Sequence, residues 1–62
     1  MKNRIRELRK EHGFSQEKIA KKCFVSRQTI NAIENDKYDP TLKLAFRLAK
    51  VFGVKVDDLF SP

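Results

Sequence analysis

Residues Phe14 to Asn35 read FSQEKIAKKCFVSRQTINAIEN, and this stretch decides the fold. Its apolar residues recur at the spacing of two short amphipathic helices with a tight turn between them. Ser15 and Ser26 each stand where a side chain can accept a hydrogen bond from the following helix, so both are predicted N-caps. The inward faces of the two helices would carry small or branched side chains: Ile19, Ala20, Cys23, Ile30 and Ile33.

The second of these helices offers Arg27 and Gln28 from its first turn. Arginine and glutamine form paired hydrogen bonds with the edges of guanine and adenine, and a helix of this kind fits the major groove of DNA. The stretch that decides the fold therefore also indicates a DNA-binding function.

The charge of the chain favours a polyanionic partner without identifying one. The 62 residues carry a formal net charge of +6, from 14 Lys and Arg against 8 Asp and Glu. The basic excess is concentrated in the first ten residues, whereas Asp57 and Asp58 make the tail locally acidic. Nucleic acid suits such an excess, but a small domain with a solvated basic surface would have the same composition.

Length and composition argue against several other classes of protein. A chain of this size makes one domain, residues 1–62, with a small core. Its single cysteine, Cys23, cannot form an internal disulfide, and with one histidine, His12, it cannot supply the four ligands of a structural zinc site. There is no Gly-rich phosphate loop and no evident nucleophile and base, so an enzyme is not expected. We expect no cofactor.

The sequence also gives no sign of membrane insertion or export. No apolar run approaches the roughly 20 residues that span a bilayer, and the N-terminus lacks the apolar segment of a signal peptide. The unpaired cysteine fits a reducing compartment. We therefore expect a cytoplasmic protein that does not contact membranes.

Three further helices are predicted around the central pair. One runs roughly from Asn3 to Glu11 and ends at Gly13, and another spans roughly Thr41 to Phe52 and ends at Gly53. A short fifth helix lies near Val56 to Phe60, and no segment alternates convincingly as a strand. The expected fold is all-α, a compact five-helix domain.

Together these residues resemble the helix-turn-helix of the λ/434 repressor and Cro family, also called the XRE family. The resemblance depends on the joint spacing of Gln16, Ala20, Val25, Ser26, Ile30, Ile33 and Glu34. It continues through Lys37, Pro40 and the 48–54 segment to Leu59, so it covers nearly the whole chain. It implies a λ-repressor-like fold with the helix-turn-helix at about 15–35, and a transcriptional regulator that binds double-stranded DNA in a sequence-specific way.

The resemblance also implies roles for individual side chains. It places Arg27, Gln28 and Asn31 on the bases. It places five others on the DNA backbone, where contacts fix register without reading sequence: Gln16, Thr29, Asn35, Lys37 and Tyr38. The residues leave plainer roles open, since Gln16 could be an exposed helix-start residue, Tyr38 a packing residue, and Thr29 a side chain bonded to its own helix.

The chain departs from the family pattern inside and after the motif. Phe24 and Asp36 stand where relatives usually have glycine. If Phe24 is left-handed, its side chain strains the turn by roughly 1 kcal/mol or more, whereas aspartate tolerates this conformation better. Ala32 stands where relatives often have a longer polar side chain, so we expect few base contacts there.

The last third of the chain has more apolar residues than one small core needs. The 41–52 helix has two apolar faces, one with Leu42 and Phe46 and the other with Leu44 and Val51. We expect the surplus to form the interface of a symmetric homodimer: Leu44, Val51, Val54, Leu59 and Phe60. A dimer would hold two recognition helices about 34 Å apart and act, as a repressor, on a pseudo-palindromic operator.

Two alternatives to this dimer remain open at the level of sequence. The tail could fold back on a monomer. The domain could instead be an adaptor or antitoxin-like module that binds a protein partner through its apolar C-terminal face, with DNA binding incidental.

Overall fold

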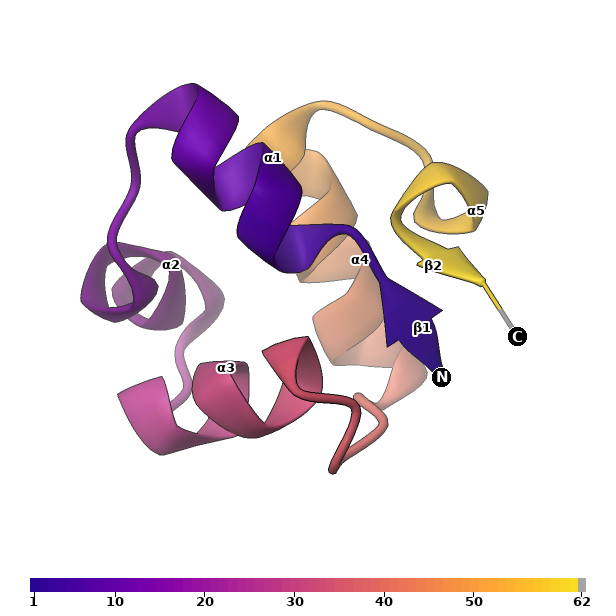
Figure 1. Cartoon of the computed structure of the whole chain (residues 1–62), viewed down its shortest axis with the longest axis horizontal. Coiled ribbons are helices and arrows are strands. Elements are labelled where there is room, and N and C mark those ends of the chain that lie inside the picture. The colour runs from indigo at the N-terminus through magenta and orange to yellow at the C-terminus, as the bar shows by residue number, and fades with distance from the viewer. Residues whose placement is uncertain (62) are drawn as a thin grey trace.

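The computed structural model describes residues 1–61, which form five helices and one short pair of strands (Figure 1). The helices are α1 (Ile5–His12), α2 (Gln16–Cys23), α3 (Arg27–Glu34), α4 (Leu42–Phe52) and α5 (Val56–Leu59). The strands are β1 (Lys2–Asn3) and β2 (Phe60–Ser61). The predicted five-helix, λ-repressor-like fold is confirmed. No helix in this part of the chain is long and apolar enough to cross a bilayer.

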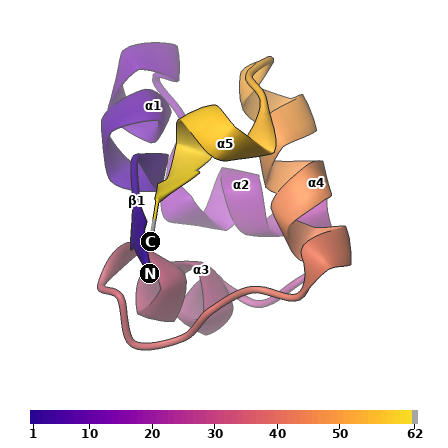
Figure 2. The same ribbon diagram turned by 90° about the vertical axis from the view of Figure 1, so that its right-hand side faces the viewer.

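The strand pair joins the two ends of the chain, and the sequence did not predict it. β1 and β2 are antiparallel, with Lys2 opposite Ser61 and Asn3 opposite Phe60. The Arg4 N–H continues the contact by donating to the Leu59 carbonyl at 2.9 Å. Figure 2 shows β1 beside the chain that leaves α5. Because these first residues are paired, they form part of the fold and not a free basic arm.

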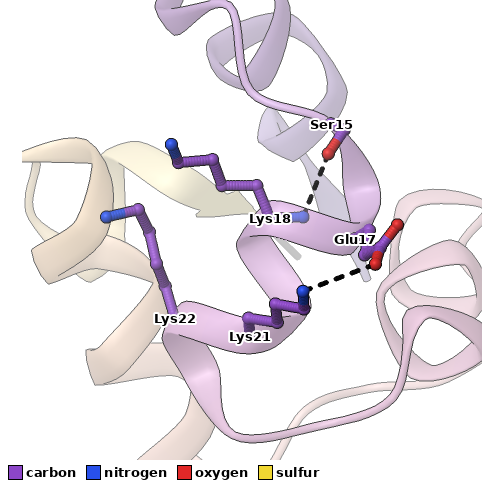
Figure 3. Close-up of a pocket in the computed structure, with 5 residues that line it drawn as sticks. All are labelled: Ser15, Glu17, Lys18, Lys21 and Lys22. Carbon is purple, nitrogen blue, oxygen red and sulfur yellow. Dashed lines mark hydrogen bonds and ion pairs between the residues drawn. The ribbon is translucent and has the colours of Figure 1, made fainter.

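The two predicted N-caps are confirmed. Ser15 Oγ accepts a hydrogen bond from the Lys18 N–H at 3.0 Å, and Ser26 Oγ accepts one from the Thr29 N–H at 3.2 Å (Figure 3 shows the first). Thr41 caps α4 in the same way, so α4 begins one residue later than predicted. These caps satisfy backbone donors at both starts of the helix-turn-helix and set where its helices begin.

Four of residues 1–61 have left-handed backbone conformations. Gly13 (φ 70°) and Gly53 (φ 69°) end α1 and α4, as predicted. Asp36 (φ 58°) and Phe24 (φ 61°) take the same conformation without being glycine. The Phe24 ring is 79% exposed, so packing in the core does not offset its strain. The Arg47 guanidinium lies over the ring, 5.1 Å from its centroid.

Replacing Phe24 by glycine is expected to stabilise the fold by about 0.5–1 kcal/mol, because glycine adopts a positive φ without strain. Part of the gain is cancelled by the lost Arg47 contact and by the freer unfolded chain. For a domain of this size the gain corresponds to a rise in Tm of a few degrees, on the order of 2–8 °C, measurable by circular dichroism. Phe24→Ala is the control, since it removes the ring and keeps the Cβ. Equal Tm values for the two variants would contradict the assignment of strain.

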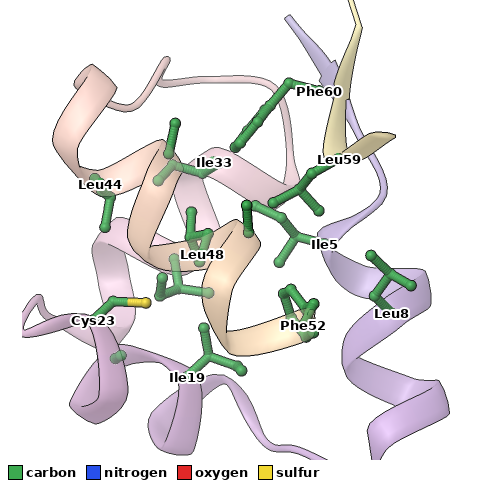
Figure 4. Packing of buried hydrophobic residues seen from close by; sticks show 14 residues of the cluster. Ile5, Leu8, Ile19, Cys23, Ile33, Leu44, Leu48, Phe52, Leu59 and Phe60 are labelled. Atoms are coloured by element: carbon green, nitrogen blue, oxygen red, sulfur yellow. The ribbon is translucent and has the colours of Figure 1, made fainter. Parts of the chain in front are cut away.

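The core lies between the helices and is built mainly from aliphatic side chains (Figure 4). Its buried members are Ile5, Leu8, Ile19, Ala20, Cys23, Ile30, Ile33, Leu44, Ala45, Leu48, Ala49, Phe52, Leu59 and Phe60. The predicted inward faces of α1, α2 and α3 are confirmed. Val25 in the turn packs against this core, which fixes the angle between α2 and α3.

The predicted faces of α4 are partly wrong. Leu42 and Phe46, on the face that was not assigned to the dimer, are 68% and 58% exposed, whereas Leu44, on the predicted dimer face, is buried. The reason is geometric: Leu48 is fully buried at the middle of the helix, and Leu44 and Phe52, four residues to either side, share its face. Two apolar stripes on one helix make the periodicity ambiguous, and packing against the other helices decides between them.

This packing also corrects the predicted dimer surface. Three of its five residues are buried in the core of the chain itself: Leu44, Leu59 and Phe60. α5 packs against α4, and the pairing of β2 with β1 holds the end of the chain in place, so the tail covers its own apolar residues. Val51 and Val54 are half-buried. The apolar surplus therefore lies at Leu42 and Phe46.

Candidate nucleic-acid interface

α3 presents a polar row to solvent on the side opposite its buried residues. Arg27, Gln28 and Asn31 are exposed, whereas Ile30 and Ile33 pack in the core. Among residues 1–61, the hydrogen bonds around this row leave the side chains of Arg27 and Gln28 without a partner. Both side chains are therefore available to an external ligand from the first turn of the helix.

Gln16, at the start of α2, is brought onto this row. Its Nε2 donates to Asn31 Oδ1 at 3.2 Å and to Glu34 Oε1 at 3.3 Å. From the end of α3, Asn35 Nδ2 donates to the carbonyl oxygen of Asn31 at 2.9 Å and to its Oδ1 at 3.3 Å. Three of the predicted contact residues thus form one hydrogen-bonded group, contributed by both helices of the motif.

A buried carboxylate stands behind this group. The Glu34 side chain has no exposed surface, and it lies 2.9 Å from Arg9 Nε and 3.3 Å from Arg6 Nε. Arg9 binds it through two nitrogens and is itself only 16% exposed, and Arg6 Nη2 also donates to Asn35 Oδ1 at 2.9 Å. The cluster fixes α1 against α3 and holds Gln16 in position.

Arg6 and Arg9 were not predicted to serve the site. The sequence does hold a signal for them, because two arginines three positions apart share one face of α1. That face points to the end of α3, where Glu34 is the acidic residue of the helix. Pairing them from sequence would have required knowing that α1 crosses α3.

The other three predicted backbone-contact residues, Thr29, Lys37 and Tyr38, do not belong to this hydrogen-bonded group. Thr29 is half-buried and its hydroxyl lies 3.0 Å from Ser26 Oγ, which matches the plainer role of a side chain bonded to its own helix start. Lys37 and Tyr38 are exposed in the loop after α3. The Lys37 N–H donates to the Ala32 carbonyl at 2.9 Å, so the loop backbone is anchored while both side chains extend into solvent.

An open hollow of about 350 Å³ lies where α2 and α3 begin. Its lining includes Gln16, Arg27 and Arg9, together with Ser15 and Glu17. The exposed Arg27 guanidinium and the N–H groups at a helix start could hold an anion there, because Arg9 is already bound to Glu34. The exposed row of α3 and this hollow are therefore adjacent.

Two further titratable residues, Cys23 and His12, make contacts within the fold. Burial raises the pKa of the Cys23 thiol, so this side chain is an unreactive part of the core. His12 bonds to the Leu8 carbonyl at 2.9 Å and packs edge-on against Phe52. Within residues 1–61, no three His, Cys, Asp or Glu side chains are grouped to hold a metal ion.

Comparison with known proteins gives a consistent set of relatives. A family described as Helix-turn-helix matches residues 5–59. The chain is 60% identical over 60 residues to an HTH-type transcriptional regulator of Methanocaldococcus jannaschii, covering 97% of this chain and 91% of the relative.

Two solved structures agree with these relatives. The restriction-modification controller protein C.AhdI of Aeromonas hydrophila gives a TM-score of 0.84 at 30% identity, over 92% of this chain and 86% of that one. The N-terminal DNA-binding domain of SinR from Bacillus subtilis gives 0.78 at 30% identity, over 86% and 78%.

Proposed function

The chain belongs to the XRE-type helix-turn-helix family of transcriptional regulators, and from this we propose that it represses transcription as a homodimer on a pseudo-palindromic operator. The observation that carries the proposal is the exposed row on α3. Arg27 and Gln28 extend from its first turn without partners in the described chain, beside the Gln16 and Asn31 pair. As a regulator of this kind it acts on the chromosome, in the cytoplasm.

In this proposal the contacts divide into two groups. Arg27, Gln28 and Asn31 read base edges in the major groove, Arg27 by pairing with guanine and Gln28 with adenine. Residues around them hold the DNA backbone: Gln16, Asn35, Lys37 and Tyr38. Thr29 is left out of this group because its hydroxyl already bonds to Ser26. The hollow beside Arg27 takes one of the phosphates.

A dimer follows from the small number of reading side chains. One copy with three reading side chains reads only a few base pairs, too few to single out one site among the roughly 10⁶–10⁹ competing sites of a genome. Two copies double the number of base pairs read, and a dimer bound over a promoter blocks it.

We place the dimer contact on the exposed stripe of α4. Leu42 and Phe46 are one turn apart and both largely exposed. Beside them is an open, mainly apolar hollow of about 270 Å³, whose lining residues are Met1, Pro40, Leu42, Ala45, Val56 and Phe60. This surface replaces the five residues that the sequence suggested, and a two-fold interface would set Phe46 of each copy against the hollow of the other.

Phe46→Glu is expected to convert the dimer to a monomer, because it would bury two carboxylates in an apolar contact. Light scattering at tens of micromolar protein would report the change, and Lys43→Glu is the matched control on the same helix. Affinity for a two-half-site duplex should fall while affinity for one half-site is retained. A parent protein with the mass of a single chain would contradict the dimer.

The same apolar stripe supports a second function, in which the domain is an adaptor or antitoxin-like module. The stripe would then bind a different protein, and DNA contact would be incidental. The two functions differ in an observable way: an adaptor would copurify with one partner and show no salt-sensitive preference for any DNA sequence.

Selection of bound duplexes from random DNA tests the proposed function. The expected result is a consensus of two half-sites related by a two-fold axis, with centres about 34 Å apart or a multiple of that distance. A consensus with one half-site would contradict the dimer and keep the DNA-binding role. Recovery of no consensus at low salt would contradict both.

A further inference from the structure

Phe24 combines two unfavourable features. It adopts a left-handed backbone conformation, φ 61°, and it leaves most of a large apolar ring in water. A strained residue persists when its surroundings favour it, but the core does not include this ring, and the Arg47 guanidinium lies over it. A strained backbone and an exposed ring that add little stability to the fold indicate that Phe24 binds another molecule.

The ring forms part of an open hollow between the end of α2 and the second half of α4. The hollow measures about 420 Å³ and is lined by Lys22, Phe24, Arg47, Lys50 and Val51. Val51 packs against the core and supplies an aliphatic floor, while Phe24 supplies an aromatic wall. A hollow of this size and lining suits one bulky apolar side chain.

The rim of the hollow is cationic and lacks acidic partners. Among residues 1–61, the ion pairs include none of Lys22, Arg47 and Lys50. Three cations around an apolar hollow repel one another and gain from a ligand that brings carboxylates. The ligand that complements this surface is therefore apolar at its centre and acidic at its edges.

The cationic rim continues along α2. Lys18 and Lys22 lie over the ring of Phe14, with each ammonium less than 6 Å from its centroid. Figure 3 shows both lysines extending to the same side of α2, whereas Lys21 turns toward Glu17 at 3.6 Å. Lys18 thus extends the surface to a length that suits several residues of an extended peptide.

We propose that this surface binds an acidic segment of a partner protein, with one bulky apolar side chain of the segment inserted beside Phe24. We call it the Phe24 surface, and it comprises Lys18, Lys22, Phe24, Arg47, Lys50 and Val51. It shares no residue with the DNA-reading row or the α4 stripe. The protein can therefore hold DNA and a partner together, which goes beyond DNA binding and dimerisation.

Two other occupants fit the surface less well. A second copy could offer its acidic pair Asp57 and Asp58, but the apolar residues that follow, Leu59 and Phe60, are buried in its own core. A nucleic acid would satisfy the cations, but its phosphates would leave the aliphatic floor at Val51 unfilled. Both occupants are distinguished by the experiment below.

The test is a titration of the ¹⁵N-labelled full chain with a capped peptide, Glu-Glu-Asp-Leu-Phe-Asp-Glu-Glu, followed by NMR. Shift changes should concentrate on residues 22–25 and 47–51. A matched peptide with Ser-Ser in place of Leu-Phe should bind about tenfold more weakly, and Phe24→Gly should weaken the Leu-Phe peptide by a similar factor. Phe24→Gly is expected to fold at least as well as the parent, so loss of binding would not reflect unfolding.

Arg47→Ala and Lys10→Ala each remove one positive charge, from a half-buried side chain on the Phe24 surface and from an exposed side chain away from it. Arg47→Ala should weaken peptide binding several-fold, and Lys10→Ala should leave it unchanged. The proposal is overturned if the peptide does not bind, if both peptides bind equally, or if Phe24→Gly binds as the parent does. It is also overturned if single-stranded thymidine DNA shifts the same residues at lower concentration, or if protein concentration alone shifts them.

Discussion

Replacing Glu34 by alanine is expected to destabilise the fold by about 3 kcal/mol, the largest predicted effect of a single substitution on stability. The substitution removes a wholly buried carboxylate and leaves Arg9, which is itself mostly buried, without its counter-charge. Breaking one side of a buried pair costs about 3–5 kcal/mol because the remaining charge stays desolvated. Arg6 is half-exposed and can turn into water, which is why we expect the lower end of that range.

The loss would be a large share of the total stability. Domains have roughly 0.05–0.15 kcal/mol of stability per residue, which gives about 3–9 kcal/mol for a chain of this length. Urea denaturation measures the change. Glu17→Ala is the control, since its pair with Lys21 at 3.6 Å is exposed on both sides and should cost less than about 0.5 kcal/mol. Similar losses in the two variants would mean that the Glu34 cluster contributes little to the fold.

The second large effect concerns DNA recognition. Arg27→Ala should lower affinity for the selected operator by about 1–3 kcal/mol per half-site, because it removes a bidentate base contact. Affinity for unrelated DNA should change much less, so the ratio of specific to non-specific binding falls. Fluorescence anisotropy on the selected and a scrambled duplex measures that ratio.

Lys37→Ala distinguishes a contact to the DNA backbone from a contact to a base in the same assay. It should weaken binding to both duplexes alike and reduce the slope of log K against log salt by about one per chain. If Arg27→Ala instead bound both duplexes as the parent does, Arg27 would not read a base, and the assignment of the α3 row would be wrong.

How far the sequence predicts the fold depends on how many apolar stripes each helix carries. α1, α2 and α3 have one stripe each, so their inward residues and the caps at Ser15 and Ser26 could be assigned. α4 has two stripes, and only its packing against the other helices shows that Leu48 and not Phe46 faces inward. The strands β1 and β2 have two residues each, too short for alternation to be seen.

The candidate site could likewise be predicted only where it depends on the spacing within one helix. The exposed row of Arg27, Gln28 and Asn31 follows from the spacing of one helix with a known inward face. The Glu34 cluster joins residues 25 and 28 positions apart in the chain, and no local pattern encodes such a contact. Sequence therefore indicated which side chains face outward, but not what holds them in place.

Which groups donate and which accept around Asn31 is determined by the charged groups of the Glu34 cluster. A carboxylate can only accept and a guanidinium can only donate. Glu34 therefore requires the NH₂ group of Gln16, and Arg6 requires the oxygen of Asn35. Gln16 and Asn35 in turn both direct N–H groups to Asn31 Oδ1, so the amide orientations are fixed from both ends.

The consequence is a restriction on the base that Asn31 can read. Its oxygen is occupied by two protein donors, so its side chain offers DNA only the two N–H bonds of its NH₂ group. Pairing with adenine would require that oxygen to accept from the N6 amino group, whereas guanine and thymine present acceptors at their major-groove edges. In the proposed complex, the base preference at this position would be determined by a carboxylate that does not touch DNA, and Glu34→Gln, which can donate as well as accept, is a route to changing it.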